Sequence, residues 1–288
     1  MTLQELPIPV RPSVPEGPAN IRLERPKGWQ PVNVRELWEF RELLAFLAWR
    51  DVKVRYRQTL LGIGWAVLQP ALMMVVFAVF FGRLAKVDTG GVPYPLFVYI
   101  GLLPWTFFST AIASAGNSVV GSERLITKIY FPRLAIPLAA VGAAVVDFVV
   151  ALGLLIVLMI WYGVPPGPSL LVVPVVFAGV LVAALAVGTS LASLTVAYRD
   201  FRYVTPFLIQ LWLFATPTVY LQPTTGTVNS LLLTLNPMSG LVGAFRAACL
   251  GQPIAWGTLA ACVAVSAAAL VAGCMLFRRM EQSFADVI

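Results

Sequence analysis

The chain has 288 residues, of which 59% are hydrophobic and only 11% are charged, and its mean hydropathy is +0.85. A soluble domain carries roughly 25% charged residues, so this composition excludes a single water-soluble domain and indicates an integral membrane protein. Histidine is absent, which removes the commonest general base and the commonest metal ligand. We therefore expect no catalytic residue and no metal site in this chain.

Residues 1–32 are rich in proline and charge and contain no apolar run, so we expect a disordered cytosolic tail without a signal-peptide core. Residues 33–57 predict an amphipathic helix, because Asn33 and Glu36 have the spacing of a capping box and apolar residues recur at helical intervals. We expect this interface helix to lie in the headgroup layer, with its basic side chains near anionic lipid or a bound subunit. Those side chains include Arg41, Arg50, Lys53 and Arg55.

Residues 58–288 are expected to form one membrane domain with six spans, each near or above the ~20 residues that cross the hydrocarbon core. The spans are predicted at about 61–84, 94–120, 134–161, 170–197, 204–221 and 256–277.

Two short apolar pieces flank a turn signal at 236–240, which predicts a re-entrant hairpin between the fifth and sixth spans. The predicted fold class is thus an all-α integral membrane protein with six transmembrane helices, an N-terminal amphipathic interface helix and this hairpin. Arg246 lies in the second arm, where it would face an acidic substrate leaving the pore or snorkel to the outer interface.

The basic residues predict the orientation of the chain. Seventeen of the 20 Lys and Arg residues fall on the N-terminal segment, the second-to-third and fourth-to-fifth loops, and the C-terminal tail. The positive-inside rule then places both termini in the cytosol. This asymmetry also accounts for the net charge of +7 without a nucleic-acid partner.

The charged stretch at 123–137, ERLITKIYFPRLAIP, lies between the second and third spans. We interpret it as a cytosolic loop that transmits a displacement from a partner protein to the spans. Gly116 and Gly121 have Walker A spacing, but Ser122 and Glu123 follow where that motif needs Lys and Ser or Thr. We therefore expect the chain not to hydrolyse ATP itself.

Asp147 is the only acidic residue deep in a predicted span, which makes it a functional candidate. It could relay a proton, or it could be neutral or hydrogen-bonded across a helix interface. The sequence places no basic partner inside the membrane, which favours the structural interpretation. Small residues at four-residue spacing, such as Ala184 and Gly188 in the fourth span and Ala269 and Gly273 in the sixth, predict close helix packing.

Aromatic residues are dense in the first, second and fifth spans. Sugars stack on aromatic faces, so these residues suit a pore for a glycan; the alternative is an interfacial aromatic belt with lipid-facing side chains.

A series of short motifs lies along residues 34–288. They are RYRQTLLG at 55–62, Trp65, Gln69-Pro70, GLLPW at 101–105, Phe107-Phe108, Asn117, LITK at 125–128, FPR at 131–133, Pro137, YRD at 198–200, Thr216-Pro217, Tyr220 and NPM at 236–238. In these features the chain resembles permeases of the type-2 subfamily of ABC transporters. Within that subfamily it is similar to the polysaccharide and polyol-phosphate exporters, which include the O-antigen, capsule and teichoic-acid permeases.

The resemblance implies a homodimer with two copies of a separate ABC ATPase, which holds ATP and Mg, so this chain needs no cofactor. The implied cargo is a polysaccharide linked to an undecaprenyl lipid, moved from the cytosol to the outer face of the bacterial plasma membrane.

The resemblance also implies a role for particular residues. Residues 123–130 would form a coupling helix, and the implied coupling residues are Glu123, Arg124, Leu125, Lys128, Tyr130 and Arg133. The interface helix would share the ATPase contact. The first and fifth spans would line the channel through Trp65, Phe77, Phe80, Phe207, Trp212 and Tyr220. The hairpin would form an outer gate that contains Asn236, Pro237 and Arg246.

Three alternatives remain at this point. One is an ABC exporter of a small lipid or drug. Another is an ion-coupled secondary flippase that uses Asp147, but such folds usually have repeated halves, and 61–161 shows no convincing repeat in 170–277. The third, a membrane-bound enzyme, lacks histidine and clustered carboxylates.

Overall fold

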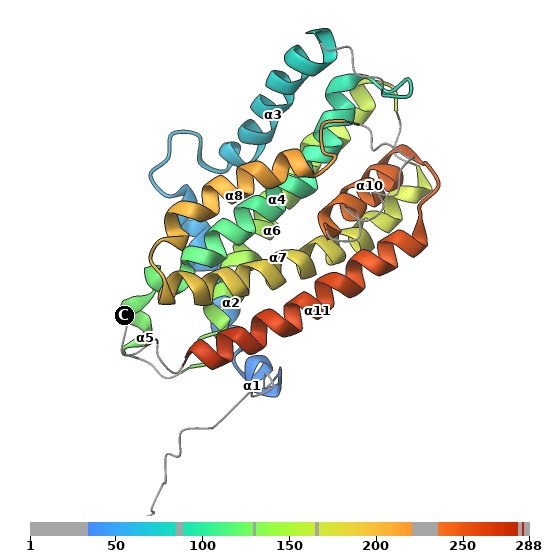
Figure 1. Cartoon of the computed structure of the whole chain (residues 1–288). Helices are drawn as coiled ribbons and strands as arrows, with labels where there is room; N and C mark the ends of the chain where they lie inside the picture. The colour runs from blue at the N-terminus through green and yellow to red at the C-terminus, as the bar shows by residue number, and fades with distance from the viewer. Residues whose placement is uncertain are drawn as a thin grey trace, which may run out of the picture.

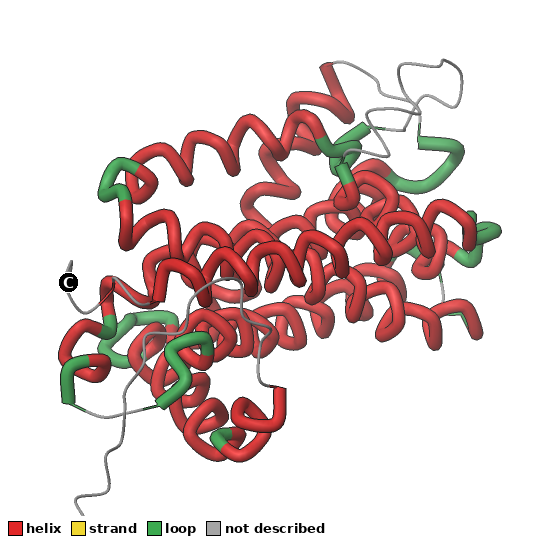
Figure 2. The backbone as a smooth tube through the Cα atoms, turned by 60° about the horizontal axis from the view of Figure 1, so that its bottom comes forward, coloured by secondary structure: helices red, strands yellow, loops and turns green. Residues whose placement is uncertain are grey.

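The computed structural model describes residues 34–84, 89–128, 131–164, 167–220, 236–281 and 284. All regular structure in these ranges is helical, which confirms the all-α fold class (Figure 2). The helices before the third span are α1 (Val34–Glu39), α2 (Arg41–Tyr56), η1 (Gly62–Gly64), α3 (Trp65–Phe77), η2 (Ala78–Leu84), α4 (Tyr94–Gly121) and α5 (Glu123–Ile126). The others are α6 (Ala135–Trp161), η3 (Pro168–Val172), α7 (Val173–Ala197), α8 (Phe201–Ala215), α10 (Pro237–Leu250) and α11 (Trp256–Glu281).

Five helical stretches in the described part of the chain are long and apolar enough to cross a membrane. They are Gly62–Gly82, Tyr94–Gly121, Ala135–Trp161, Pro168–Ala197 and Trp256–Glu281. Each overlaps a span predicted from the sequence. The remaining predicted span, 204–221, corresponds to α8, whose 15 residues are about 22 Å long and shorter than the ~30 Å hydrocarbon core.

The core is built around α4, which packs against α3, α6, α7, α8 and α10 (Figure 1). Small residues permit this packing, as predicted. A Cβ added at Gly188 of α7 would lie 2.8 Å from the Ala115 Cβ of α4, and one at Gly273 of α11 would lie 2.8 Å from the Ala186 carbonyl of α7. Close approach between backbones gives the bundle its van der Waals contact, which matters because lipid supplies no hydrophobic drive between helices.

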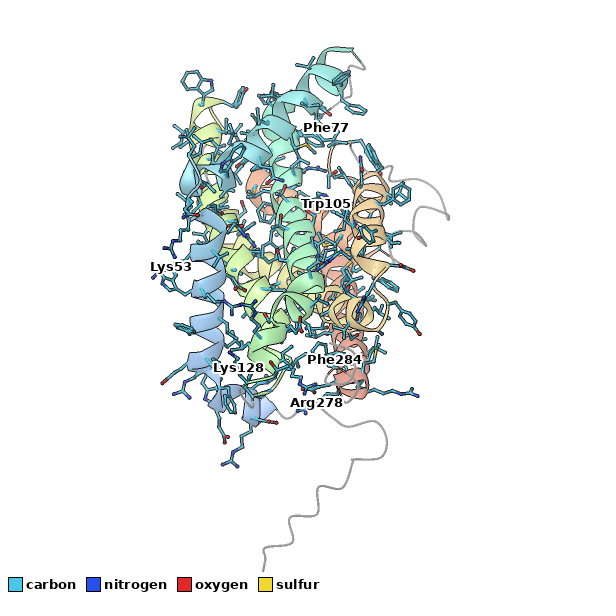
Figure 3. The ribbon with its side chains drawn as sticks, turned by 90° about the vertical axis from the view of Figure 1, so that its left-hand side faces the viewer. Lys53, Phe77, Trp105, Lys128, Arg278 and Phe284 are labelled. Atoms are coloured by element: carbon cyan, nitrogen blue, oxygen red, sulfur yellow. The ribbon has the colours of Figure 1, made fainter. Side chains whose placement is uncertain are left out.

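Among the described residues, the loops and helix ends expected to be cytosolic gather at one end of the bundle, which we call the basal end. Figure 3 shows Lys128, Arg278 and Phe284 at this end, Phe77 at the opposite end and Trp105 between them. The basal end has a small hydrophobic core of its own, here the basal cluster, formed by Val119, Phe131, Leu134, Ala135, Ile136, Ala192, Val196, Phe277 and Phe284. It joins the ends of α4, α7 and α11 to the start of α6.

The predicted interface helix is α2, which packs on the bundle and runs lengthwise beside the first half of α6 (Figure 3). Its place in the headgroup layer stays a prediction. Ala48 packs 3.6 Å from the Cβ position of Gly142, and one turn of α6 further along, Arg55 reaches Asp147. The physical reason is that Arg55 and Tyr56 find polar partners inside the bundle, which fix the end of α2 against α6.

Some predicted features lie outside the described residues. They are the tail at 1–32, the proposed cap Asn33, the coupling residue Tyr130 and the first arm of the hairpin at 230–235.

Candidate functional site

A single helical turn at the basal end, α5, covers the first half of the coupling helix predicted at 123–130. Glu123, Arg124 and Lys128 are exposed, whereas Leu125 and Ile126 are half-buried against the basal cluster. The turn thus has a charged outer face and an apolar inner face that is seated on the ends of the membrane helices. A force applied to the outer face would reach those helices through direct packing.

Arg133 behaves differently from the other predicted coupling residues. Its backbone N–H donates to Glu281 Oε1 at 3.2 Å, and its guanidinium Nη1 donates to the Glu281 carbonyl at 2.7 Å. Next to it, Phe131 is buried in the basal cluster with Phe277. Arg133 therefore anchors the loop to the end of α11 within the same chain.

Three of the four basic residues predicted on the interface helix lie toward its outer surface. Arg41 donates to the Trp38 carbonyl at 3.3 Å, Arg50 pairs with Asp51, and the Lys53 ammonium lies 5.6 Å from the Trp49 ring centroid. These local contacts leave the three cations at the surface. Arg55, the fourth, turns into the bundle.

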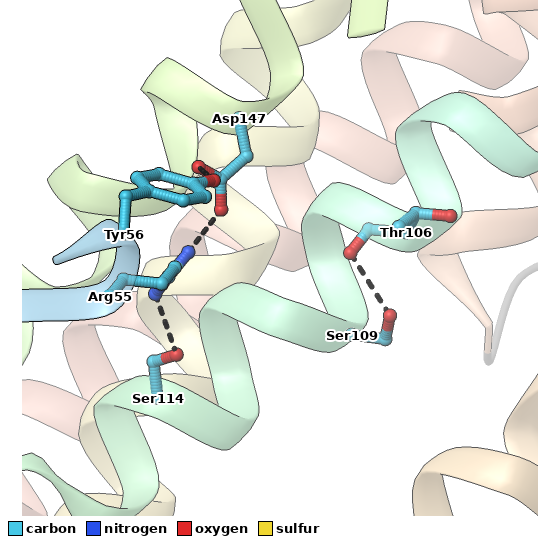
Figure 4. Close-up of polar contacts among 6 residues, drawn as sticks. All are labelled: Arg55, Tyr56, Thr106, Ser109, Ser114 and Asp147. Atoms are coloured by element: carbon cyan, nitrogen blue, oxygen red, sulfur yellow. Dashed lines mark hydrogen bonds and ion pairs between the residues drawn. The ribbon is translucent and has the colours of Figure 1, made fainter. Parts of the chain in front are cut away.

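Arg55 is the centre of a polar network that joins α2, α4 and α6 (Figure 4). Its guanidinium forms an ion pair with Asp147 through Nη1 and donates to Ser114 Oγ through Nη2 at 3.2 Å. The Tyr56 hydroxyl donates to the other Asp147 oxygen. The phenol is thus a donor in this network.

This network corrects the expectation that Asp147 has no basic partner. The partner was missed because it belongs to a helix that the sequence places at the membrane surface, 92 residues earlier. A lone carboxylate in an apolar span was the available signal that a buried cation must exist. A cavity of about 20 Å³ borders Asp147 between α3, α4 and α6, which is room for about one water molecule.

The predicted channel residues fall into two groups. Trp65, Phe80 and Phe207 are exposed on α3, η2 and α8, the elements at the margin of the bundle. Phe77 is buried in the core, and Trp212 and Tyr220 are half-buried. The exposed group presents the larger surface to a second protein copy or a glycan, and Phe77 presents almost none.

Asn236, a predicted gate residue, joins the end of α8 to the start of α10. Its Oδ1 accepts hydrogen bonds from Trp212 Nε1 at 3.0 Å and from the Met238 backbone N–H at 3.1 Å. Its amide nitrogen donates to the Ala215 carbonyl and to Thr216 Oγ1. The side chain caps α10, with Pro237 at the first helical position, where its missing N–H costs nothing. Trp212, predicted for the channel, and Asn236, predicted for the gate, are thus joined by a hydrogen bond.

Arg246 occupies neither of its two expected positions. It is only 6% exposed, so it faces neither an open pore nor the membrane surface. Its Nη2 donates to the carbonyls of Pro217 and Thr218 at 3.2 and 2.7 Å, and its guanidinium stacks 4.0 Å from the Phe97 ring centroid. The chain breaks from helical geometry after α8, and this cation satisfies the freed carbonyls.

Comparison with known proteins agrees with this architecture. The family model for ABC-2 type transporters matches residues 42–250. The chain belongs to the ABC-2 type transporter family. This confirms the resemblance drawn from the ordered motifs, and the match extends from α2 to the end of α10.

Individual ABC-2 relatives cover nearly the whole chain. The O-antigen export system permease protein RfbA of Myxococcus xanthus is 34% identical over 258 residues, which are 88% of this chain and 98% of the relative. A protein of the same description from Klebsiella pneumoniae is 24% identical over 248 residues, covering 86% and 95% of the two chains. A second Klebsiella pneumoniae relative is 23% identical over the same length.

Proposed function

We propose that this chain is the permease subunit of an ABC exporter that moves an undecaprenyl-linked, O-antigen-type polysaccharide from the cytosol to the outer face of the bacterial plasma membrane. The observation that carries the proposal is the near full-length similarity to an O-antigen export permease, at 34% identity. Similarity over 98% of that relative includes α2, the coupling turn and the hairpin arm, so it is not confined to generic apolar spans.

The proposed assembly is a homodimer with two copies of an ABC ATPase, which supplies ATP and Mg at its own sites. Each permease copy has six spans, an interface helix that shares the ATPase contact, an outer hairpin and both termini in the cytosol. The exposed outer face of α5 supports an ATPase contact at the basal end. The exposed aromatic residues of α3 and α8 support a channel at the seam between two copies. Asn236 and Pro237 would belong to its outer gate, with Arg246 buried behind them.

The proposed mechanism couples ATP binding to this seam. Closure of the two ATPases presses on α5 and α2. The basal cluster and the Arg133–Glu281 contact carry the displacement of α5 to α11, while the Arg55–Asp147 pair carries that of α2 to α6. The two ATPase states must contact these levers differently, since only differential contact shifts an equilibrium.

Co-purification tests the proposal. The chain is co-expressed with a candidate ABC ATPase from the same operon, the complex is extracted in mild detergent, and its mass is measured. Polysaccharide at the cell surface is measured in parallel. We expect a two-plus-two complex with ATPase activity, which is lost when residues 123–130 are replaced by a Gly/Ser linker. A permease that binds no ATPase and drives export from a proton gradient would contradict it.

The alternatives differ in one measurement each. An ion-coupled flippase would export in response to a proton gradient and would lose that export in Asp147→Asn, the residue that pairs with Arg55 in this structure. An ABC exporter of a small lipid or drug would show ATPase stimulation by that compound and no surface polysaccharide.

A further inference from the structure

A polar cleft at the basal end has no role in the function described so far. It has a volume of about 280 Å³ and lies between α5, the end of α7 and the start of α8. Figure 1 shows these three elements meeting at the same end of the bundle. The cleft is lined by Val120, Glu123, Thr195, Val196, Arg199, Arg202 and Tyr203.

The charges of the cleft favour an anion. Arg199 and Arg202 contribute two guanidinium groups, and Glu123 is the one carboxylate among the lining residues. The Arg202 side chain donates only its Nε, to Asn117 Oδ1 at 3.4 Å. The Arg199 guanidinium has no hydrogen-bond or ion-pair partner within the described residues. Their terminal N–H groups are therefore available, and the planar guanidinium fork matches phosphate oxygens in two-point hydrogen bonds.

An apolar stripe leads away from the cleft along α8. Tyr203, Phe207, Leu211 and Phe214 are each more than half exposed. Their spacing of four, four and three residues places them on one face of the helix. The stripe begins at the cleft itself, because Tyr203 lines both. A ligand that fills both features has an anionic head and a long apolar chain.

We propose that this cleft binds the phosphate head of the lipid-linked polysaccharide before translocation, with the lipid chain lying on the α8 stripe. The proposal rests on the proposed function, since it assigns the place where the same substrate is loaded. Glu123 belongs to α5 and also lines the cleft. Movement of α5 therefore shifts its carboxylate relative to the two arginines that hold the phosphate. A bound phosphate is thereby released when the ATPase displaces α5.

The test measures lipid binding to the intact permease–ATPase complex by native mass spectrometry, with undecaprenyl diphosphate as the probe. We expect the double variant Arg199→Gln/Arg202→Gln to bind it at least about tenfold more weakly, because charge-assisted hydrogen bonds are roughly twice as strong as neutral ones. Glu123→Gln should bind it more tightly, since the variant removes the opposing charge. Arg279→Gln, an exposed arginine on α11 outside the cleft, is the matched control and should bind normally.

Two further probes separate the possible sources of binding. Neutral undecaprenol has the lipid chain without the phosphates, and phosphatidylglycerol is an ordinary anionic phospholipid. Undiminished binding by the double variant overturns the cleft assignment, while surface polysaccharide in the same cells leaves the proposed function standing. Equal loss of phosphatidylglycerol binding overturns it as well, because the cleft is then a general lipid contact. Loss of the ATPase subunit with normal lipid binding overturns it in favour of a protein interface. A wild-type complex that neither binds the diphosphate lipid nor exports polysaccharide defeats both proposals.

Discussion

Arg55 at the end of α2 forms an ion pair with Asp147 near the middle of α6, 92 residues further along the chain. The pair fixes the interface helix to the core of the bundle at the depth of the spans. Ser114 and Tyr56 complete its hydrogen bonds, so both charges are partnered in a region of low dielectric. The network ties α2 to α6, as the proposed lever between an ATPase and the membrane requires.

Asp147→Asn should destabilise the protein by about 2 kcal/mol, because it leaves the Arg55 cation partly buried without its counter-ion. The midpoint of thermal unfolding of the purified complex measures the effect. Asp51→Asn, which breaks the surface pair with Arg50, is the control and should change stability by less than about 1 kcal/mol. The double variant Arg55→Gln/Asp147→Asn should recover part of the loss. Equal midpoints of thermal unfolding for Asp147→Asn and the wild type would show that the Arg55–Asp147 pair adds nothing to the stability of the protein.

Gly101→Ala should be strongly destabilising, by about 1–3 kcal/mol. A Cβ at this position would collide with the Thr218 carbonyl oxygen and the Arg246 guanidinium, so the segment after α8 must move. Gly153→Ala in α6 is a matched control, because nothing lies within 4 Å of its Cβ position. Alanine at that helical site should stabilise slightly. The idea fails if thermal melting ranks the two variants in the opposite order.

Asn236→Ala should cost about 2 kcal/mol, because it removes the cap of α10 and leaves Trp212 Nε1 without its acceptor. Trp212→Phe removes only that donor and should cost about 1 kcal/mol. Hydrogen exchange of the first turn of α10 reports the difference, since only the Asn236 variant exposes the Met238 amide. If the two side chains share a hydrogen bond, the double variant Trp212→Phe/Asn236→Ala should lose less stability than the sum of the two single losses. A loss equal to that sum would argue against the shared bond.

Lys128→Glu should reduce transport-coupled ATP turnover several-fold, because it reverses an exposed charge on the proposed ATPase contact. Gln252→Glu adds negative charge at the exposed opposite end of the molecule and should leave turnover unchanged. The measurement is ATP hydrolysis by the reconstituted complex with and without substrate. Wild-type turnover in Lys128→Glu would remove this residue from the contact.

The helical class and the positions of most spans could be predicted from the sequence alone. The helix Tyr94–Gly121 agrees with its prediction to within one residue, and Ala135–Trp161 agrees equally well. Such agreement is expected because crossing a bilayer demands a continuous apolar length, which is a local property of the chain. The ordered motifs likewise gave the family before any contact was known.

Which polar groups meet could not be predicted in this way and is seen first in the folded chain. Asp147 was expected to be without a cation and is paired with Arg55, while Arg246 was expected at a surface and is buried on Phe97. Phe77 and Phe80, three residues apart, were predicted to share a channel, but one is buried and the other exposed. The physical reason is that a charge inside a membrane must find a partner wherever packing provides one, and no local pattern records which helix that will be.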